Sequence, residues 1–88
     1  MKYRSRTEIT SQILEAAHGG ATKTRIMYKA FLTFVQLKEY KSVLVENGLL
    51  DFDENTQLYK TTEKGLQFLK LYNQLSECVQ QPKIRSMP

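Results

Sequence analysis

The chain has 88 residues, a net charge of +4 and a pI near 9.3, with 41% hydrophobic and 25% charged residues. This length and balance are typical of one globular domain and argue against a disordered chain. A single cysteine, Cys78, excludes an internal disulfide and a cysteine-based metal site. Because no apolar run is long enough for a signal peptide or a membrane span, we expect a cytoplasmic protein. The basic charge by itself is a weak indication of polyanionic partners.

The first helix is expected to follow a short basic arm, residues 1–6. Ser5 and Glu8 have the spacing of a capping box, which marks the N-terminus of a helix. Gly19 and Gly20 are expected to end this helix, because glycine tolerates the left-handed conformation of a C-cap. The apolar positions at helical spacing, which predict its buried face, are Ile9, Ile13, Ala16 and Ala17.

Two further helices follow, with only a short turn between them. Thr22 is the expected N-cap of a helix over 23–30. Thr33 and Gln36 form a second capping-box pattern, so the next helix begins there and runs to Asn47. The inward-facing residues of the two helices are predicted to be Ile26, Met27, Ala30, Leu37, Tyr40 and Leu44. Such a tight connection indicates a helix-turn-helix, although any helical bundle also has short turns.

The next segment predicts a β-hairpin. Residues 49–52 and 57–61 are rich in strand-forming side chains, and residues 53–56 between them have turn chemistry. An isolated hairpin is marginally stable in water, so this one must pack against the helices. Three helices followed by a hairpin is the element order of a winged helix-turn-helix, an α+β fold, which we expect over residues 7–61.

The final helix is expected over 62–80, stopped by Pro82. Leu66 and Leu69 are predicted to reach the core. A second stripe has the alternating spacing of a coiled-coil seam and predicts a dimer interface with another copy of the chain. This seam consists of Phe68, Tyr72, Leu75 and Val79. We expect residues 81–88 to form a disordered tail.

The helix over 33–47 would lie in the major groove of a DNA duplex, and its outward face supplies the candidate contacts. Lys38 could donate to guanine, Glu39 could accept from cytosine, and Val35 could pack on a thymine methyl group. The complete set of candidate DNA contacts is Lys23, Thr24, Arg25, Thr33, Val35, Gln36, Lys38, Glu39, Lys41, Ser42 and Lys60. Of these, Lys23, Thr24, Arg25 and Lys41 are the better candidates for phosphates. The alternative for each residue is a solvated helix face.

The predicted hairpin has an acidic tip, with Asp51, Asp53 and Glu54. A wing that grips the minor groove usually presents Arg or Lys, and carboxylates facing phosphates would repel them. Either the tip points away from DNA or residues 55–57 make the contacts; we expect a passive wing. The acidic residues lack the spacing of a calcium loop. Because no phosphate loop, nucleophile motif or zinc spacing is present, we expect no enzymatic activity, no metal and no cofactor.

Several motifs resemble those of small archaeal winged helix-turn-helix DNA-binding proteins. They are residues 20–30, 36–40, 46–50 and the strand-to-helix junction Tyr59-Lys-Thr-Thr-Glu-Lys-Gly65, and the resemblance covers about residues 6–75. It implies a winged helix whose extended C-terminal helix pairs with its twin in an antiparallel coiled coil. It also implies a transcriptional regulator or a chromatin-associated, nucleoid-associated protein.

Two functions remain open from the sequence. The first is binding of double-stranded DNA by a homodimer. The alternative is a winged helix that serves only as a protein–protein interaction module, which an acidic wing and a modest net charge would also suit. A salt-dependent affinity for duplex DNA separates the two, because phosphate contacts release counterions.

Overall fold

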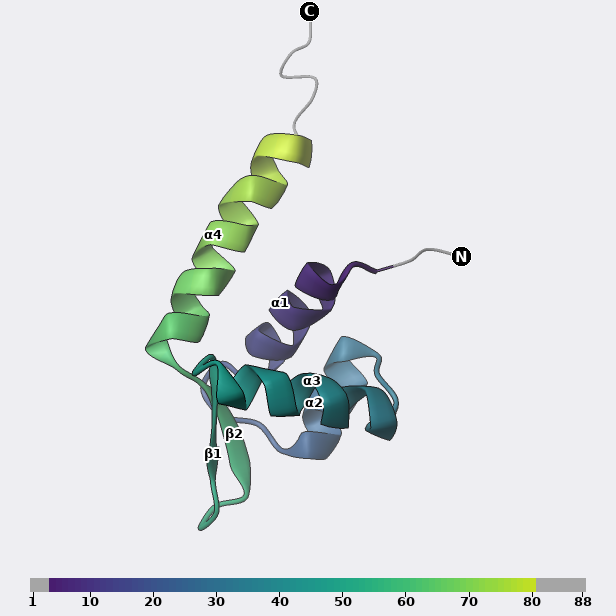
Figure 1. Ribbon diagram of the computed structural model, residues 1–88, viewed down its shortest axis with the longest axis vertical. Helices are drawn as coiled ribbons and strands as arrows, with labels where there is room; N and C mark the ends of the chain where they lie inside the picture. The colour runs from purple at the N-terminus through teal and green to yellow at the C-terminus, as the bar shows by residue number, and fades with distance from the viewer. Residues whose placement is uncertain (1–3, 81–88) are drawn as a thin grey trace, which may run out of the picture.

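The computed structural model describes residues 4–80, and for residues 76–80 it describes the backbone alone. The elements are α1 (Arg6–Ala16), α2 (Lys23–Ala30), α3 (Phe34–Glu46), β1 (Leu50–Asp53), β2 (Leu58–Thr61) and α4 (Glu63–Gln80). Helix α3 lies across the middle of the molecule, the β1–β2 hairpin projects to one side, and α4 extends to the other (Figure 1). This architecture confirms the predicted α+β winged helix. The strands lie within one residue of the predicted hairpin boundaries.

The N-termini of α1, α2 and α3 are each capped by the predicted hydroxyl. The Ser5 hydroxyl accepts a hydrogen bond from the Glu8 N–H at 3.0 Å, and Thr22 caps α2 in the same way. At Thr33 the hydroxyl accepts from the Gln36 N–H, and the Gln36 side-chain oxygen accepts from the Thr33 N–H. Among the described helices, this is the capping box that is complete in both directions. The first turn of α3 is therefore held from both sides.

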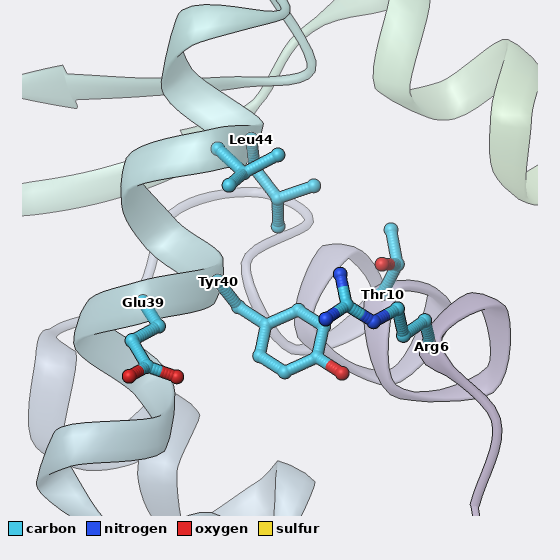
Figure 2. A pocket seen from close by; sticks show the side chains of 6 residues that line it. Arg6, Thr10, Glu39, Tyr40 and Leu44 are labelled. Atoms are coloured by element: carbon cyan, nitrogen blue, oxygen red, sulfur yellow. The ribbon is translucent and has the colours of Figure 1, made fainter.

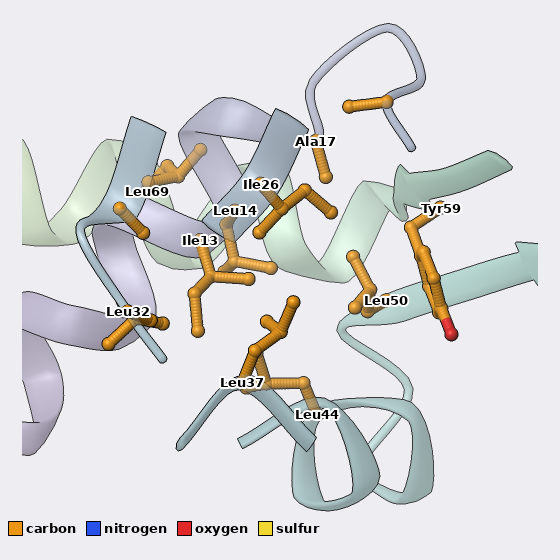
Figure 3. Packing of buried hydrophobic residues seen from close by; sticks show 12 residues of the cluster. Ile13, Leu14, Ala17, Ile26, Leu32, Leu37, Leu44, Leu50, Tyr59 and Leu69 are labelled. Carbon is orange, nitrogen blue, oxygen red and sulfur yellow. The ribbon is translucent and has the colours of Figure 1, made fainter. Parts of the chain in front are cut away.

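One hydrophobic cluster lies between the three N-terminal helices, the hairpin and α4. Leu37 and Leu44 of α3 point into it toward Ile13 of α1 (Figure 3). The buried members are Ile13, Leu14, Ala17, Ala21, Ile26, Ala30, Leu32, Leu37, Leu44, Leu50, Tyr59 and Leu69. The predicted inner stripes of α2 and α3 are thus confirmed, with Met27 and Tyr40 packing at the edge.

The prediction that Leu66 reaches the core is wrong. Leu66 is 36% exposed, whereas Leu69 is buried and Phe68 packs against the cluster. The cause is Gly65, which faces inward: a Cβ there would overlap the Leu49 carbonyl oxygen and lie 2.6 Å from Thr61 Cγ2. With Gly65 facing inward, Leu69 one turn later also faces the core, and Leu66 is rotated about 100° away.

The hairpin is tied to the helical part of the molecule by bonds that the sequence did not predict. The Ala21 N–H donates to the Tyr59 carbonyl at 2.9 Å, and the Tyr59 N–H donates back to the Ala21 carbonyl at 2.8 Å. These two bonds form an isolated antiparallel bridge between the segment before α2 and β2. The buried Thr61 hydroxyl also donates to the Leu14 carbonyl at 2.6 Å. The hairpin therefore has a fixed position relative to α1 and α2.

Candidate nucleic-acid interface

One flank of α3 carries a row of residues at positions i, i+4 and i+7: Phe34, Lys38 and Lys41. This spacing places the three side chains above one another on one side of the helix. Leu37 and Leu44 fix the direction of that side, because both are buried under the helix. The packing of Leu37 and Leu44 therefore determines the direction in which Phe34, Lys38 and Lys41 point.

Two lysines at this row are held against aromatic rings. The Nζ atom of Lys23 lies 4.4 Å from the ring centroid of Phe34. The Nζ atom of Lys41 lies 5.1 Å from the ring centroid of Tyr59. Each contact is a cation–π interaction, which orients the lysine without neutralising its charge. Lys23 thus links α2 to α3, and Lys41 links α3 to the hairpin.

Among the predicted DNA contacts, Lys23, Lys38 and Lys41 are brought together on this face, and Val35 and Ser42 lie on the neighbouring exposed surface of α3. Val35 is 62% exposed in the first turn of the helix. Thr33 and Gln36 are exposed as well, but their side chains form the capping box.

Four of the predicted residues, Thr24, Arg25, Glu39 and Lys60, lie outside this row. Glu39 is exposed on α3 at the rim of a groove of about 380 Å³ that Arg6 and Tyr40 also line, and its carboxylate points away from Arg6 (Figure 2). Thr24 and Arg25 line a separate hollow between α2 and Leu58 of β2. Lys60 is exposed on the hairpin directly opposite Asp51 of β1. A cross-strand pair of opposite charges offsets the charge that Lys60 could offer to phosphates.

The hairpin turn is organised by its own polar side chains. The Asp53 carboxylate accepts from the Asn55 N–H at 2.9 Å, and the Asp53 carbonyl accepts from the Gln57 N–H at 2.7 Å. The Gln57 side-chain amide donates to the Glu54 carbonyl. Behind the turn, the Phe52 and Tyr59 rings pack with centroids 4.5 Å apart. The acidic tip is thus a turn held by hydrogen bonds of its own residues, and the Gln57 side-chain amide is used within the turn.

Sequence reasoning missed three exposed aromatic side chains around the turn between α2 and α3: Tyr28, Phe31 and Phe34. None of the three belongs to the helical stripes that predict the core, and large apolar residues outside such stripes could have indicated an exposed surface. It also missed the role of Arg4, which was assigned to a basic arm. The Arg4 guanidinium donates to the carbonyl oxygens of Ala30 and Phe31 and to Gln12. Arg4 therefore secures the C-terminus of α2.

The predicted seam of α4 is divided by the structure. Phe68 is half-buried against the core and meets Tyr72 edge-to-face, with ring centroids 6.3 Å apart. Leu75 is 66% exposed, and Leu71, which was not part of the predicted seam, is 61% exposed. Val79 lies outside the described side chains. Among the described residues, no helix is both long and apolar enough to cross a membrane.

Comparisons with known proteins agree with this architecture. A family model described as winged helix-turn-helix matches residues 3–80. Among solved structures, the chain is similar to Sso10a-2, a DNA-binding protein from Sulfolobus solfataricus, with 23% identity and a TM-score of 0.71. The match covers 97% of this chain and 100% of the other. No curated protein sequence matches the chain.

Proposed function

The chain belongs to the winged helix-turn-helix family, and on that premise we propose that it binds double-stranded DNA with α3 in the major groove. The observation that carries the proposal is the row of Phe34, Lys38 and Lys41 on α3, with Lys23 of α2 held beside it. The similar Sso10a-2 structure is of a DNA-binding protein. A role as a transcriptional regulator or a chromatin-associated protein, which would put the chain on the nucleoid, belongs to the same proposal.

The lysines on this face have separate roles in the proposed complex. Lys23 and Lys41 lie against aromatic rings at the two edges of the face. These positions favour contacts to the phosphates on either side of a groove. Lys38 lies between them on the exposed side of α3, where it could donate to the acceptors of guanine. Glu39 is exposed on the same helix, so a contact from its carboxylate to cytosine stays part of the proposed base readout.

We propose that the chain forms a homodimer through α4. Leu71 and Leu75 are exposed one turn apart on the half of α4 that extends beyond the core. A second copy would cover them in a helix–helix contact. The half-buried Phe68 supports the beginning of α4 from within its own chain, so the outer half of the helix carries the proposed interface.

The test is the fluorescence anisotropy of a labelled random-sequence duplex, titrated with protein at several salt concentrations. The expected result is binding whose log K falls linearly with log salt. Lys38→Ala and Lys41→Ala should each weaken binding, and a lost phosphate contact should reduce the salt slope by about 0.9. Lys70→Ala is the matched control, because it removes the same charge from the exposed surface of α4. Equal effects of all three substitutions would point to net charge and contradict the α3 interface.

The alternative function is a winged helix that binds only proteins. The acidic tip of the hairpin, with Asp53 and Glu54, is the observation that favours it. Absence of duplex binding at about 50 mM salt, where phosphate contacts are strong, would make this alternative the better one.

A further inference from the structure

The turn between α2 and α3 and the first residues of α3 present apolar side chains beside the proposed lysine contacts. Phe31, Phe34 and Val35 are 80%, 48% and 62% exposed, and they lie within five consecutive residues. Single exposed apolar residues are ordinary on protein surfaces, whereas a contiguous group indicates a contact surface. We call these three residues the apolar patch.

Phe31 is held in this patch at a conformational cost. It is the C-cap of α2 and has left-handed backbone angles, φ 53° and ψ 53°. Glycine or asparagine adopts this conformation with less strain than phenylalanine. Arg4 donates to the Phe31 carbonyl at 2.8 Å and stabilises the turn. A bulky side chain that is strained and also exposed is difficult to explain by folding, and such outliers concentrate at functional sites.

The surroundings of the patch select its partner by charge. Residues 20–38 contain four basic residues and no acidic residue, and Lys23 lies on the Phe34 ring itself. An apolar patch in a positive frame matches a partner with apolar groups between negative charges. The major groove of thymine-containing DNA has this arrangement, with C5-methyl groups on its floor and phosphates along both edges. A second copy of this basic chain would instead bring like charges together.

We propose that Phe31, Phe34 and Val35 pack against thymine C5-methyl groups, so that the chain prefers A·T-rich duplexes. This inference rests on the proposed function and adds the class of base that the recognition surface selects. Phe31 is new to the proposed interface, Phe34 gains a direct contact to bases, and Val35 gains two apolar neighbours in its predicted contact.

The test compares two duplexes that differ only in the methyl group: an A·T-rich duplex and the same duplex with deoxyuridine in place of every thymidine. Anisotropy at one fixed salt concentration gives both affinities. The expected result is that the unmodified chain binds the deoxyuridine duplex about fourfold more weakly, the factor that burial of one methyl group is worth. Phe31→Asn, Phe34→Ala and Val35→Ala should each reduce this ratio toward one.

Val43→Ala is the matched control, because it makes the same change as Val35→Ala on the same helix but at the groove beside α1. This variant should keep the full preference for thymidine. Equal affinity of the unmodified chain for both duplexes would overturn the inference and leave DNA binding intact. A preference that persists in all three patch variants would overturn the assignment to these residues. Absence of binding to both duplexes would overturn the proposed function together with the inference.

Discussion

At the scale of single residues, the Thr62–Gly65 segment shows how a short sequence motif connects two helices. The Thr62 hydroxyl accepts from the Gly65 N–H at 3.1 Å and donates to the Gly48 carbonyl at 2.6 Å. The Lys64 ammonium group donates to the Asn47 carbonyl at 3.0 Å. Gly65 then lets the helix backbone approach the Leu49 carbonyl, where a side chain has no space. The motif thus joins the start of α4 to the end of α3.

Gly65→Ala is expected to destabilise the protein by about 2 kcal/mol, because the added Cβ overlaps backbone atoms and cannot be relieved by a side-chain rotation. For a domain of this size, that loss lowers Tm by about 8–16 °C. Thermal denaturation followed by circular dichroism measures it. Gln67→Ala, on the exposed surface of the same helix, is the control and should change Tm little. A Gly65→Ala variant as stable as this control would show that α4 can move to make room for a side chain at residue 65.

Phe31→Gly is expected to stabilise the fold by about 1 kcal/mol, because glycine removes the Cβ strain of the left-handed conformation. Little packing is lost, since the Phe31 side chain is mostly exposed. Phe31→Ala distinguishes relief of the backbone strain from loss of the exposed ring, because alanine removes the ring and keeps the Cβ. Urea denaturation of both variants is the measurement. If alanine stabilises as much as glycine, backbone strain is not the cause.

At the scale of elements, the hairpin and α4 are both shaped by what they pack against. The hairpin is short and would be marginal alone, yet the Ala21 bridge, the Phe52–Tyr59 ring contact and the Thr61 hydrogen bond hold it in place. Helix α4 is anchored at its beginning by Gly65 and Leu69, and its outer half extends beyond the core. The test of the proposed dimer therefore changes residues in that outer half.

The double variant Leu71→Glu/Leu75→Glu is expected to be a folded monomer, because two carboxylates on each copy would repel one another across a helix–helix contact. Light scattering gives the mass, and circular dichroism checks the helical content. The control Lys70→Gln/Asn73→Glu lowers the net charge by the same two units on the opposite side of α4 and should remain a dimer. Unchanged dimers in the leucine variant would exclude this face as the interface.

At the scale of the whole molecule, one face combines contributions from several elements. Helix α2 supplies Lys23, α3 supplies Lys38 and Lys41, and β2 supplies the Tyr59 ring that orients Lys41. Of the acidic wing residues, Asp51 and Asp53 lie in β1 and Glu54 lies in the turn at the end of the hairpin. The affinity of the proposed DNA contact therefore depends on the charge of this face more than on the net charge of the chain.

The sequence alone determined the elements and their order, because helix caps, apolar periodicity and turn residues are local signals. Thr22 and Thr33 cap helices where their spacing predicts, and Leu37 and Leu44 face inward as the periodicity of α3 requires. These features depend on neighbours within about one helical turn. The winged-helix fold follows from them in order.

Only the tertiary structure decided which side of each element meets another. The close approach at Gly65, the exposure of Leu66 and the Ala21–Tyr59 bridge all depend on residues distant in sequence. The composition of the apolar patch has the same origin, because a phenylalanine near a helix end is as typical of a core as of a surface. Burial is a property of the packed whole, and local periodicity predicts it only where one face of an element is clearly apolar.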